Sequence, residues 1–242
     1  MVVLILGAKS DVAQAFAYES AAKGDTLILA LRNTEDLIPL KKDIELRFKT
    51  SVHLQEFDAC DFESHQGFYN GLPAKPDMVL CAFGYLGNQD TASHDFKESL
   101  KIMQVNYVGA VSILNVVAND FEARRSGVII GISSVAGERG RKSNYTYGSA
   151  KAGFSAYLSG LRNRLFASNV HVLSVKPGFI NTKMTKDLPL PAPVTAQPAE
   201  VARHIYKAAI NRQDVIYSKK IWRYIMFIIK AIPESIFKKM KL

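Results

Sequence analysis

Apolar residues recur along the chain with two different periods. Short unbroken apolar runs alternate with longer segments that have the three-to-four-residue spacing of amphipathic helices. Such runs are typical of strands buried on both faces of a parallel sheet that is covered by helices. The pattern predicts an α/β fold, a doubly wound parallel sheet in a single domain. The runs that predict strands are residues 2–6, 26–31, 78–82, 127–132 and 170–176.

The pattern changes toward the C-terminus. Repeated prolines after Asp187 exclude a continuous helix or a central strand, so we expect a loop, and helix should resume after Pro198. Residues 219–242 mix aromatic and aliphatic side chains with lysines and arginines, which predicts an amphipathic helical extension to a main domain of residues 1–218. This extension is too charged for a membrane span. It suits a membrane interface or packing against the core or another subunit, and these alternatives stay open.

Composition narrows the function classes. The 242 residues are 48% hydrophobic and 22% charged, as in a soluble globular protein, and the two cysteines form no metal-ligand pattern, so no metal is expected. The first apolar run has no basic leader, so we expect a buried strand and not a cleaved signal peptide. This favours a cytoplasmic location. A net charge of +9 attracts phosphate-bearing ligands and anionic lipids. Since no nucleic-acid-binding motif is present, we expect no nucleic-acid partner.

A strand meets a helix at Gly7–Ala13, where backbone amides and the helix dipole can hold a pyrophosphate. Dinucleotide-binding turns usually carry three glycines, but here Asp11 and Ala13 occupy the later two positions. The alternative is a plain turn in which Asp11 caps the helix. The residues expected to contact a dinucleotide here are Gly7, Lys9, Ser10, Asp11 and Val12.

The second predicted strand ends at Arg32, where an NAD site generally carries a carboxylate for the adenosine ribose. Arg32, helped by Lys9 or Ser10, can instead accept a ribose 2′-phosphate. The sequence therefore favours NADP (NADPH) over NAD, against the alternative that Arg32 is only a solvated charge.

Tyr147 and Lys151 lie one turn apart on the same face of a predicted helix. A free phenol has a pKa of ~10, so it needs a nearby cation to act as an acid or base near neutral pH. Ser134, at the end of the strand over 127–132, can hydrogen-bond a substrate carbonyl oxygen, and Ser133 can support it. Taken singly, these residues could be a surface pair and a turn serine.

Together these motifs resemble the short-chain dehydrogenase/reductase family over roughly residues 1–209, which implies a Rossmann-like catalytic domain. The resemblance implies that Tyr147 is the proton donor or acceptor and that Ser134 orients the carbonyl. It also implies that Lys151 binds the nicotinamide ribose and lowers the tyrosine pKa. Asn106 matches the family asparagine, which holds a water between the lysine and solvent.

Further matches to the family lie along the cofactor path. Asp58 corresponds to the aspartate that meets adenine, and the segment from Pro177 to Thr182 resembles the nicotinamide-side loop. The usual Asn-Asn-Ala-Gly after the fourth strand is replaced by Cys81-Ala82-Phe83-Gly84. The additional residues implied in cofactor binding are Asp58, Ala82, Gly84, Tyr147, Lys151, Pro177, Gly178, Ile180 and Thr182.

We therefore predict an NADPH-dependent ketone reductase; the alternative is a non-catalytic nucleotide sensor or scaffold on the same fold. The substrate should be enclosed by residues after Ser134, by residues 85–86 and by the loop 184–195. The C-terminal segment also resembles that of bacterial lipid-linked keto-sugar reductases, which suggests a lipid-linked or acyl-chain carbonyl substrate and contact with the inner face of the membrane. The family commonly forms homodimers and homotetramers. The residues after Ser134 expected near substrate are Glu138, Arg139 and Arg141.

Overall fold

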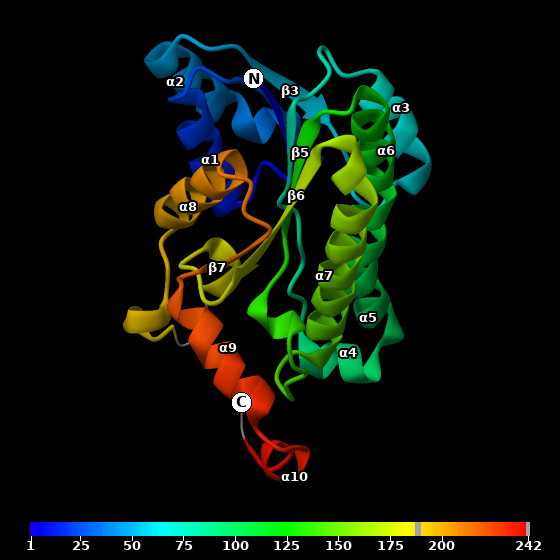
Figure 1. Ribbon diagram of the computed structural model, residues 1–242, viewed down its shortest axis with the longest axis vertical. Coiled ribbons are helices and arrows are strands. Elements are labelled where there is room, and N and C mark those ends of the chain that lie inside the picture. Colours follow the sequence, from blue (N-terminus) through cyan, green and yellow to red (C-terminus); the bar gives the residue numbers. More distant parts are fainter. Residues whose placement is uncertain (187–189, 241–242) are drawn as a thin grey trace.

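The computed structural model describes residues 1–186 and 190–240 and contains one parallel sheet with helices on both faces (Figure 1). The sheet order within this part of the chain is β3-β2-β1-β4-β5-β6-β7. The order reverses between β1 and β4, which leaves a crevice at the carboxyl ends of the strands. The strands are β1 (Val2–Leu6), β2 (Thr26–Leu31), β3 (Val52–Glu56), β4 (Met78–Cys81), β5 (Gly127–Ile132), β6 (Val170–Pro177) and β7 (Val215–Ser218).

Two helical layers cover the sheet. One side is packed by α1, α2 and α8 and the other by α3, α6 and α7, and each layer closes its own apolar core against the sheet (Figure 1). The described helices are α1 (Asp11–Ala21), α2 (Ile38–Phe48), α3 (His65–Asn70), α4 (Gln89–His94), α5 (Phe96–Met103), α6 (Gly109–Arg124), α7 (Tyr145–Leu165), α8 (Pro198–Ile210), α9 (Ile221–Ala231) and α10 (Glu234–Phe237).

The predicted doubly wound sheet is confirmed, and each apolar run contributes a strand. The sequence missed the two edge strands, β3 and β7. In β3, Val52 is buried but His53 and Glu56 are exposed, so the run lacks the continuous apolar character of a central strand. The prolines near 189–193 end before α8, which begins at Pro198 as predicted. Residues 187–189 of the predicted loop lie outside the described part of the chain.

One continuous helical stretch, Phe96–Arg124, is long and apolar enough to cross a membrane by length and composition alone. Its second half, α6, instead packs on the sheet. Ile113, Leu114, Val117 and Phe121 are fully buried there. The apolar character of this helix is therefore accounted for by the protein core.

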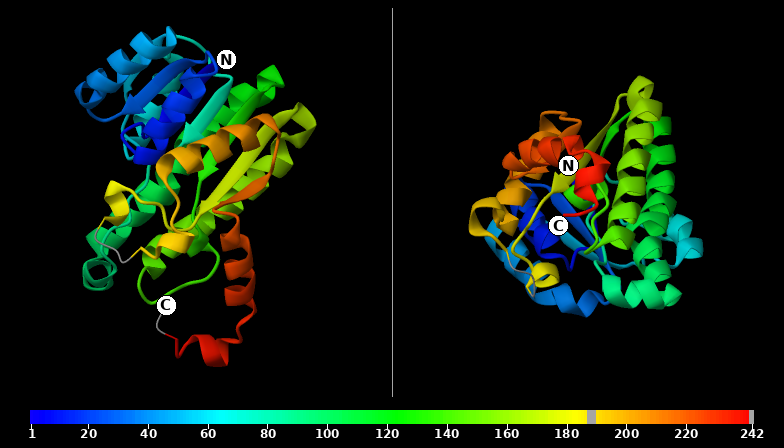
Figure 2. Two further views of the ribbon diagram at one scale, coloured as in Figure 1. Left: turned by 90° about the vertical axis from the view of Figure 1, so that its left-hand side faces the viewer. Right: turned by 90° about the horizontal axis from the view of Figure 1, so that it is seen from below.

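The C-terminal segment forms α9 and α10, and its residues 241–242 lie outside the described part. Trp222 and Met226, one turn apart on α9, are buried in a small cluster with Val135. One face of α9 therefore packs against the core, which was one of the alternatives for this segment. Figure 2 shows α9 and α10 extending away from the body of the molecule at the end where the chain terminates.

Two charged residues after β5 hold α9 in place. The Arg139 guanidinium donates hydrogen bonds to the carbonyl oxygens of Ile229 (2.7 Å) and Ile232 (2.6 Å) at the end of α9. It also pairs with Glu234 at 2.9 Å and stacks on Phe237. A cation at a helix C-terminus is stabilised by the unpaired carbonyls and the helix dipole. Arg139 therefore acts as a cap for α9.

Glu138 makes the second attachment. Its carboxylate accepts hydrogen bonds from Lys176 (2.8 Å) and Tyr217 (2.5 Å), and Lys230 of α9 lies 3.8 Å away. The expectation that Glu138 and Arg139 enclose the substrate is wrong. Both side chains are engaged with β6, β7 and the C-terminal helices, because the chain beyond residue 218 returns to this loop.

We predict that Arg139→Ala loosens α9 without unfolding the sheet. Loss of these two carbonyl hydrogen bonds should weaken attachment of the helix by about 2 kcal/mol, at roughly 1 kcal/mol each. Trp222 is the only tryptophan in the chain, so its emission should shift to the red and proteolysis after residue 218 should accelerate. Arg164→Ala, which removes an arginine paired with Glu122 on the helical layer, is the control. Unchanged emission and proteolysis in Arg139→Ala would contradict the cap.

Candidate active site

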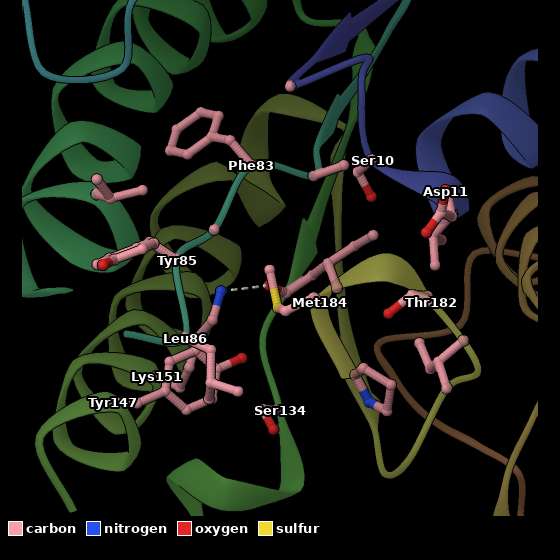
Figure 3. A pocket seen from close by; sticks show the side chains of 18 of the residues that line it. Ser10, Asp11, Phe83, Tyr85, Leu86, Ser134, Tyr147, Lys151, Thr182 and Met184 are labelled. Carbon is pink, nitrogen blue, oxygen red and sulfur yellow. Dashed lines mark hydrogen bonds between the residues drawn. The ribbon is translucent and has the colours of Figure 1, made fainter. Parts of the chain in front are cut away.

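A pocket of about 800 Å³ opens at the carboxyl ends of the central strands. Its walls come from the carboxyl ends of β2, β5 and β6, from the segments that follow β1, β3 and β4, from the first turn of α1, and from α5, α7 and α9. Figure 3 shows Tyr147, Lys151 and Ser134 near one end and Ser10 and Asp11 at the other. The predicted site residues that line this pocket are Gly7, Lys9, Ser10, Asp11, Val12, Arg32, Asp58, Ala82, Gly84, Ser134, Tyr147, Lys151, Pro177, Gly178, Ile180 and Thr182.

Three polar side chains converge at the inner end of the pocket. Tyr147 and Lys151 project from the same face of α7, and the Lys151 ammonium lies 5.8 Å from the centre of the Tyr147 ring. Ser134, which follows β5, lines the same end of the pocket as the Tyr147 phenol. The ammonium donates to the carbonyl oxygen of Ile132, the last residue of β5, at 3.0 Å. This hydrogen bond fixes the cation beside the phenol.

Burial shifts both titratable groups. It raises the pKa of Tyr147 to about 12, although the nearby Ser134 hydroxyl opposes the shift. It lowers the pKa of Lys151 to about 8, with Cys81 opposing. Without ligand, Tyr147 therefore keeps its proton at neutral pH, and Lys151 carries a positive charge with only 3% of its surface exposed. The pair holds a proton donor next to a cation that can stabilise the phenolate left after proton transfer.

Ser133 has a structural part in this arrangement. Its hydroxyl donates to the carbonyl oxygen of Lys151 at 3.0 Å and lies 2.6 Å from the Ser155 hydroxyl. Both contacts join the end of β5 to α7. Adjacent serines therefore have different tasks: Ser134 faces the pocket, and Ser133 fixes the helix that carries Tyr147.

Asn106 lies beneath the pocket wall and does not line it. Its side-chain amide donates to the carbonyl oxygens of Tyr85 (2.6 Å) and Ile102 (2.9 Å), and its oxygen accepts from the Tyr85 amide. A π-helical turn at Gln104–Val108 places it there. A side-chain carbon on Gly84 would lie 3.1 Å from the Asn106 oxygen and 3.6 Å from the Lys151 nitrogen. Asn106 thus positions the segment that passes over Lys151.

The turn after β1 is shaped to receive a dinucleotide. Gly7 has φ +80°, and a Cβ there would lie 2.5 Å from the Phe83 nitrogen, so only glycine allows this close approach. The first turn of α1 then opens onto the pocket with its amides unpaired in the helix. A single glycine is enough for the turn, although the usual motif has three.

Asp11 has a contact that the sequence did not predict. Its carboxylate accepts a hydrogen bond from the Lys183 amide at 2.7 Å, and the Lys183 ammonium lies 3.9 Å away. The side chain that stands in a glycine position therefore joins α1 to the segment after β6.

The outer end of the pocket carries basic groups. Arg32 is exposed on the wall, and Lys9 pairs with Asp36 at 2.5 Å. Asn33 and Asp36 also line this end and were missed by the sequence reasoning. The ribose-binding carboxylate of an NAD site is expected directly at the end of β2, which ends at Leu31. Asp36 lies several residues further along the chain. Nearby, the Asp58 carboxylate accepts a hydrogen bond from the Cys60 amide at 2.9 Å.

Trp222 is the main wall residue that sequence reasoning missed. A Cβ on Gly178 would overlap the indole ring, at 1.9 Å. The indole nitrogen donates to the Val194 carbonyl oxygen at 2.9 Å, and the ring packs edge-on against Phe179. Nothing local in the sequence links residue 222 to residue 178. The sequence indicates this contact only through Gly178, because a glycine leaves room for a large side chain from elsewhere in the chain.

Arg141 lines the pocket, as expected, and Tyr85 and Leu86 do as well. The Nε of Arg141 is buried without a hydrogen-bond partner, and burial lowers the pKa of the guanidinium. Within the described residues, no carboxylate lies within ion-pair distance of this guanidinium. Asn144, also on the wall, has a buried side-chain oxygen without a partner.

Comparisons with known proteins agree with this geometry. A family model described as short chain dehydrogenase matches residues 1–191. The chain belongs to the short-chain dehydrogenase family. It is an oxidoreductase of this family, whose fold binds a nicotinamide cofactor. An uncharacterised oxidoreductase of Mycobacterium tuberculosis is 33% identical over 241 residues, which cover 98% of this chain and 96% of that protein.

Solved structures of this short-chain dehydrogenase fold superpose closely. A short-chain dehydrogenase from Sphingobium yanoikuyae in complex with NADPH has a TM-score of 0.82 at 19% identity, covering 97% of both chains. A tryptophan variant of actinorhodin polyketide ketoreductase with NADPH has a TM-score of 0.79 at 19% identity, covering 89% of this chain and 94% of that one. A Brucella melitensis 3-oxoacyl-[acyl-carrier protein] reductase with bound NAD has a TM-score of 0.78 at 19% identity, covering 89% and 88%. The likeness extends to proteins solved with either nicotinamide dinucleotide.

The buried charge on Lys151 should reduce stability in a pH-dependent way. Below pH 8 the folded protein retains this charge, whereas between pH 8 and the ordinary value of 10.5 it loses a proton that the unfolded chain keeps. Stability should therefore rise across this range. Lys151→Met lacks the penalty, so its Tm relative to the parent should be highest near pH 7. That difference should shrink by on the order of 5–10 °C toward pH 10.

The measurement is thermal unfolding of the ligand-free proteins across this pH range. Lys97→Met, at an exposed lysine, is the control and should differ from the parent by a constant amount. A Lys151→Met difference that does not change with pH would show that Lys151 is not the buried cation described above.

Proposed function

We propose that this oxidoreductase is an NADPH-dependent reductase of a ketone, with Tyr147 as the proton donor. The observation that carries the proposal is the convergence of Ser134, Tyr147 and Lys151 in the same pocket as the Gly7 turn and the first turn of α1. These two groups of residues supply what carbonyl reduction needs, an acid at the carbonyl oxygen and a cradle for a dinucleotide.

The residues present fit a nicotinamide dinucleotide. The Gly7 turn allows a close backbone approach, the amides of α1 would hold the pyrophosphate, and Pro177 and Gly178 would border the nicotinamide. When bound, the nicotinamide supplies a hydride to the carbonyl carbon. Arg32 and Lys9 lie at the outer end of the pocket.

The chain's own groups then handle the oxygen. The Ser134 hydroxyl donates a hydrogen bond to the carbonyl oxygen, and the Tyr147 hydroxyl transfers its proton to the same oxygen as negative charge develops. The positive charge of Lys151 stabilises the phenolate that remains. Arg141 adds a second positive charge to the substrate end, which favours a substrate with an acidic or electron-rich group near the carbonyl.

One feature supports NADPH over NADH. Arg32 occupies the strand end where an NAD site generally has a carboxylate, and it is exposed to the pocket. A guanidinium can bind a ribose 2′-phosphate through paired charge-assisted hydrogen bonds.

We predict that Tyr147→Phe lowers kcat/KM for ketone reduction by at least ~100-fold while NADPH affinity stays within about threefold, because only the transferable proton is lost. The measurement is NADPH oxidation with a panel of ketones, beside nicotinamide fluorescence for binding. Tyr145→Phe, at an exposed tyrosine on the same helix, is the control and should keep full activity. If the parent binds NADPH but reduces no ketone in the panel, the scaffold alternative gains support.

For the cofactor, Arg32→Ala should weaken NADPH binding by about 10- to 100-fold and leave NADH binding nearly unchanged. A hydrogen bond to a charged group contributes about 1.5–3 kcal/mol. Titrations of nicotinamide fluorescence measure both affinities, and Lys42→Ala, at an exposed lysine of α2, controls for loss of general positive charge. Equal weakening by the two variants would mean that Arg32 does not read the phosphate.

A further inference from the structure

Helix α9 has two apolar faces with different environments. Trp222 and Met226 face the body of the protein and are buried. On the other side, four large apolar side chains at one face of the helix are exposed. A globular protein that needs only one apolar face for packing usually has polar residues on the other. The four are Ile221, Tyr224, Phe227 and Ile228, which are respectively 47%, 68%, 74% and 64% exposed.

Within the described residues, no element covers this outer face. Figures 1 and 2 show α9 and α10 extending from the body. Ile236 of α10 and Met240 after it are also exposed, at 55% and 40%. A contiguous exposed apolar surface of this kind marks an interaction site.

The charges around the outer face have one sign. Lys220 and Arg223 are exposed at the start of α9, and Lys238 and Lys239 follow α10. Lys230, near the end of α9, is also exposed, although its ammonium lies 3.8 Å from Glu138. Among the described residues from 219 to 240, the acidic residue is Glu234, which is paired with Arg139. The surface therefore presents an apolar centre bordered by cations.

We propose that the outer face of α9, with α10, docks on an anionic lipid surface. Aromatic and aliphatic side chains flanked by lysine and arginine suit the headgroup boundary, where the apolar groups are buried and the cations meet lipid phosphates. A second copy of the chain is a poorer occupant, because pairing this face with itself about a twofold axis places its cations opposite one another.

The position of α9 links this surface to the pocket. Trp222 lines the pocket from the inner face of the same helix whose outer face meets lipid. Resting on the proposed reductase function, this arrangement favours a ketone carried on an acyl or prenyl chain, which reaches the pocket from the membrane beside α9.

The first test is co-sedimentation of the full chain with vesicles of phosphatidylcholine alone or with one-third phosphatidylglycerol. The parent should bind the anionic vesicles, and the double variant Tyr224→Ser/Phe227→Ser should bind at least tenfold more weakly. Phe166→Ser is the matched control, since Phe166 is 83% exposed but lies after α7, and it should bind like the parent.

Equal vesicle binding by the parent and the double variant overturns the proposal. So does the absence of binding together with a parent dimer that the double variant converts to monomer in light scattering, because the face would then be a subunit interface. NADPH titration of the same samples confirms that the double variant is folded.

A second measurement tests the substrate class. With the parent, anionic vesicles should raise kcat/KM at least fivefold for a twelve-carbon methyl ketone and leave kcat/KM for butanone unchanged. With the double variant, the vesicles should change kcat/KM for neither ketone. If vesicles change kcat/KM equally for the two ketones, the proposal that the substrate reaches the pocket from the membrane is overturned. Vesicle binding with no reduction of either ketone means that the proposed reductase function fails while the docking surface stands.

Discussion

The hydrogen bond from the Lys151 ammonium to the Ile132 carbonyl oxygen joins the two elements on which the active site depends. Strand β5 ends at Ile132 and leads into Ser134, and α7 carries both Tyr147 and Lys151. The Ser133 hydroxyl binds the Lys151 carbonyl and makes a second link between the same elements. Because the strand end and the helix are fixed to each other twice, the three side chains meet without contributions from mobile loops.

The central fold and the inner site could be predicted because their signals are local. A buried central strand is an unbroken apolar run, and the pairing of Tyr147 with Lys151 follows from one helical turn. The edge strand β3 escaped prediction because only Val52 among its residues is buried, so it has neither an unbroken apolar run nor a regular alternation. Its secondary structure depends on pairing with β2 and not on its own composition.

The parts that could not be predicted depend on contacts between residues far apart in the chain. Arg139 contacts Ile229 across 90 positions, and Trp222 fills the space beside Gly178. Charge and proximity to Ser134 suggested a substrate role for Glu138 and Arg139. In the folded protein the Arg139 guanidinium instead binds the unpaired carbonyls at the end of α9. The Glu138 carboxylate lies beside lysines of β6 and α9. No periodicity in the sequence carries that information.

The contact between Asp11 and the Lys183 amide makes the two ends of the pocket a coupled system. The carboxylate lies in the turn that faces the pyrophosphate, and its partner follows Thr182 on the nicotinamide side. A dinucleotide that fixes the first turn of α1 therefore also favours one arrangement of residues 182–185, beside the substrate space. Linkage is reciprocal, so any coupling carried by this hydrogen bond would act equally on cofactor binding and on substrate binding. In this chain, an aspartate at a glycine position of the usual turn ties the first turn of α1 to the segment after β6.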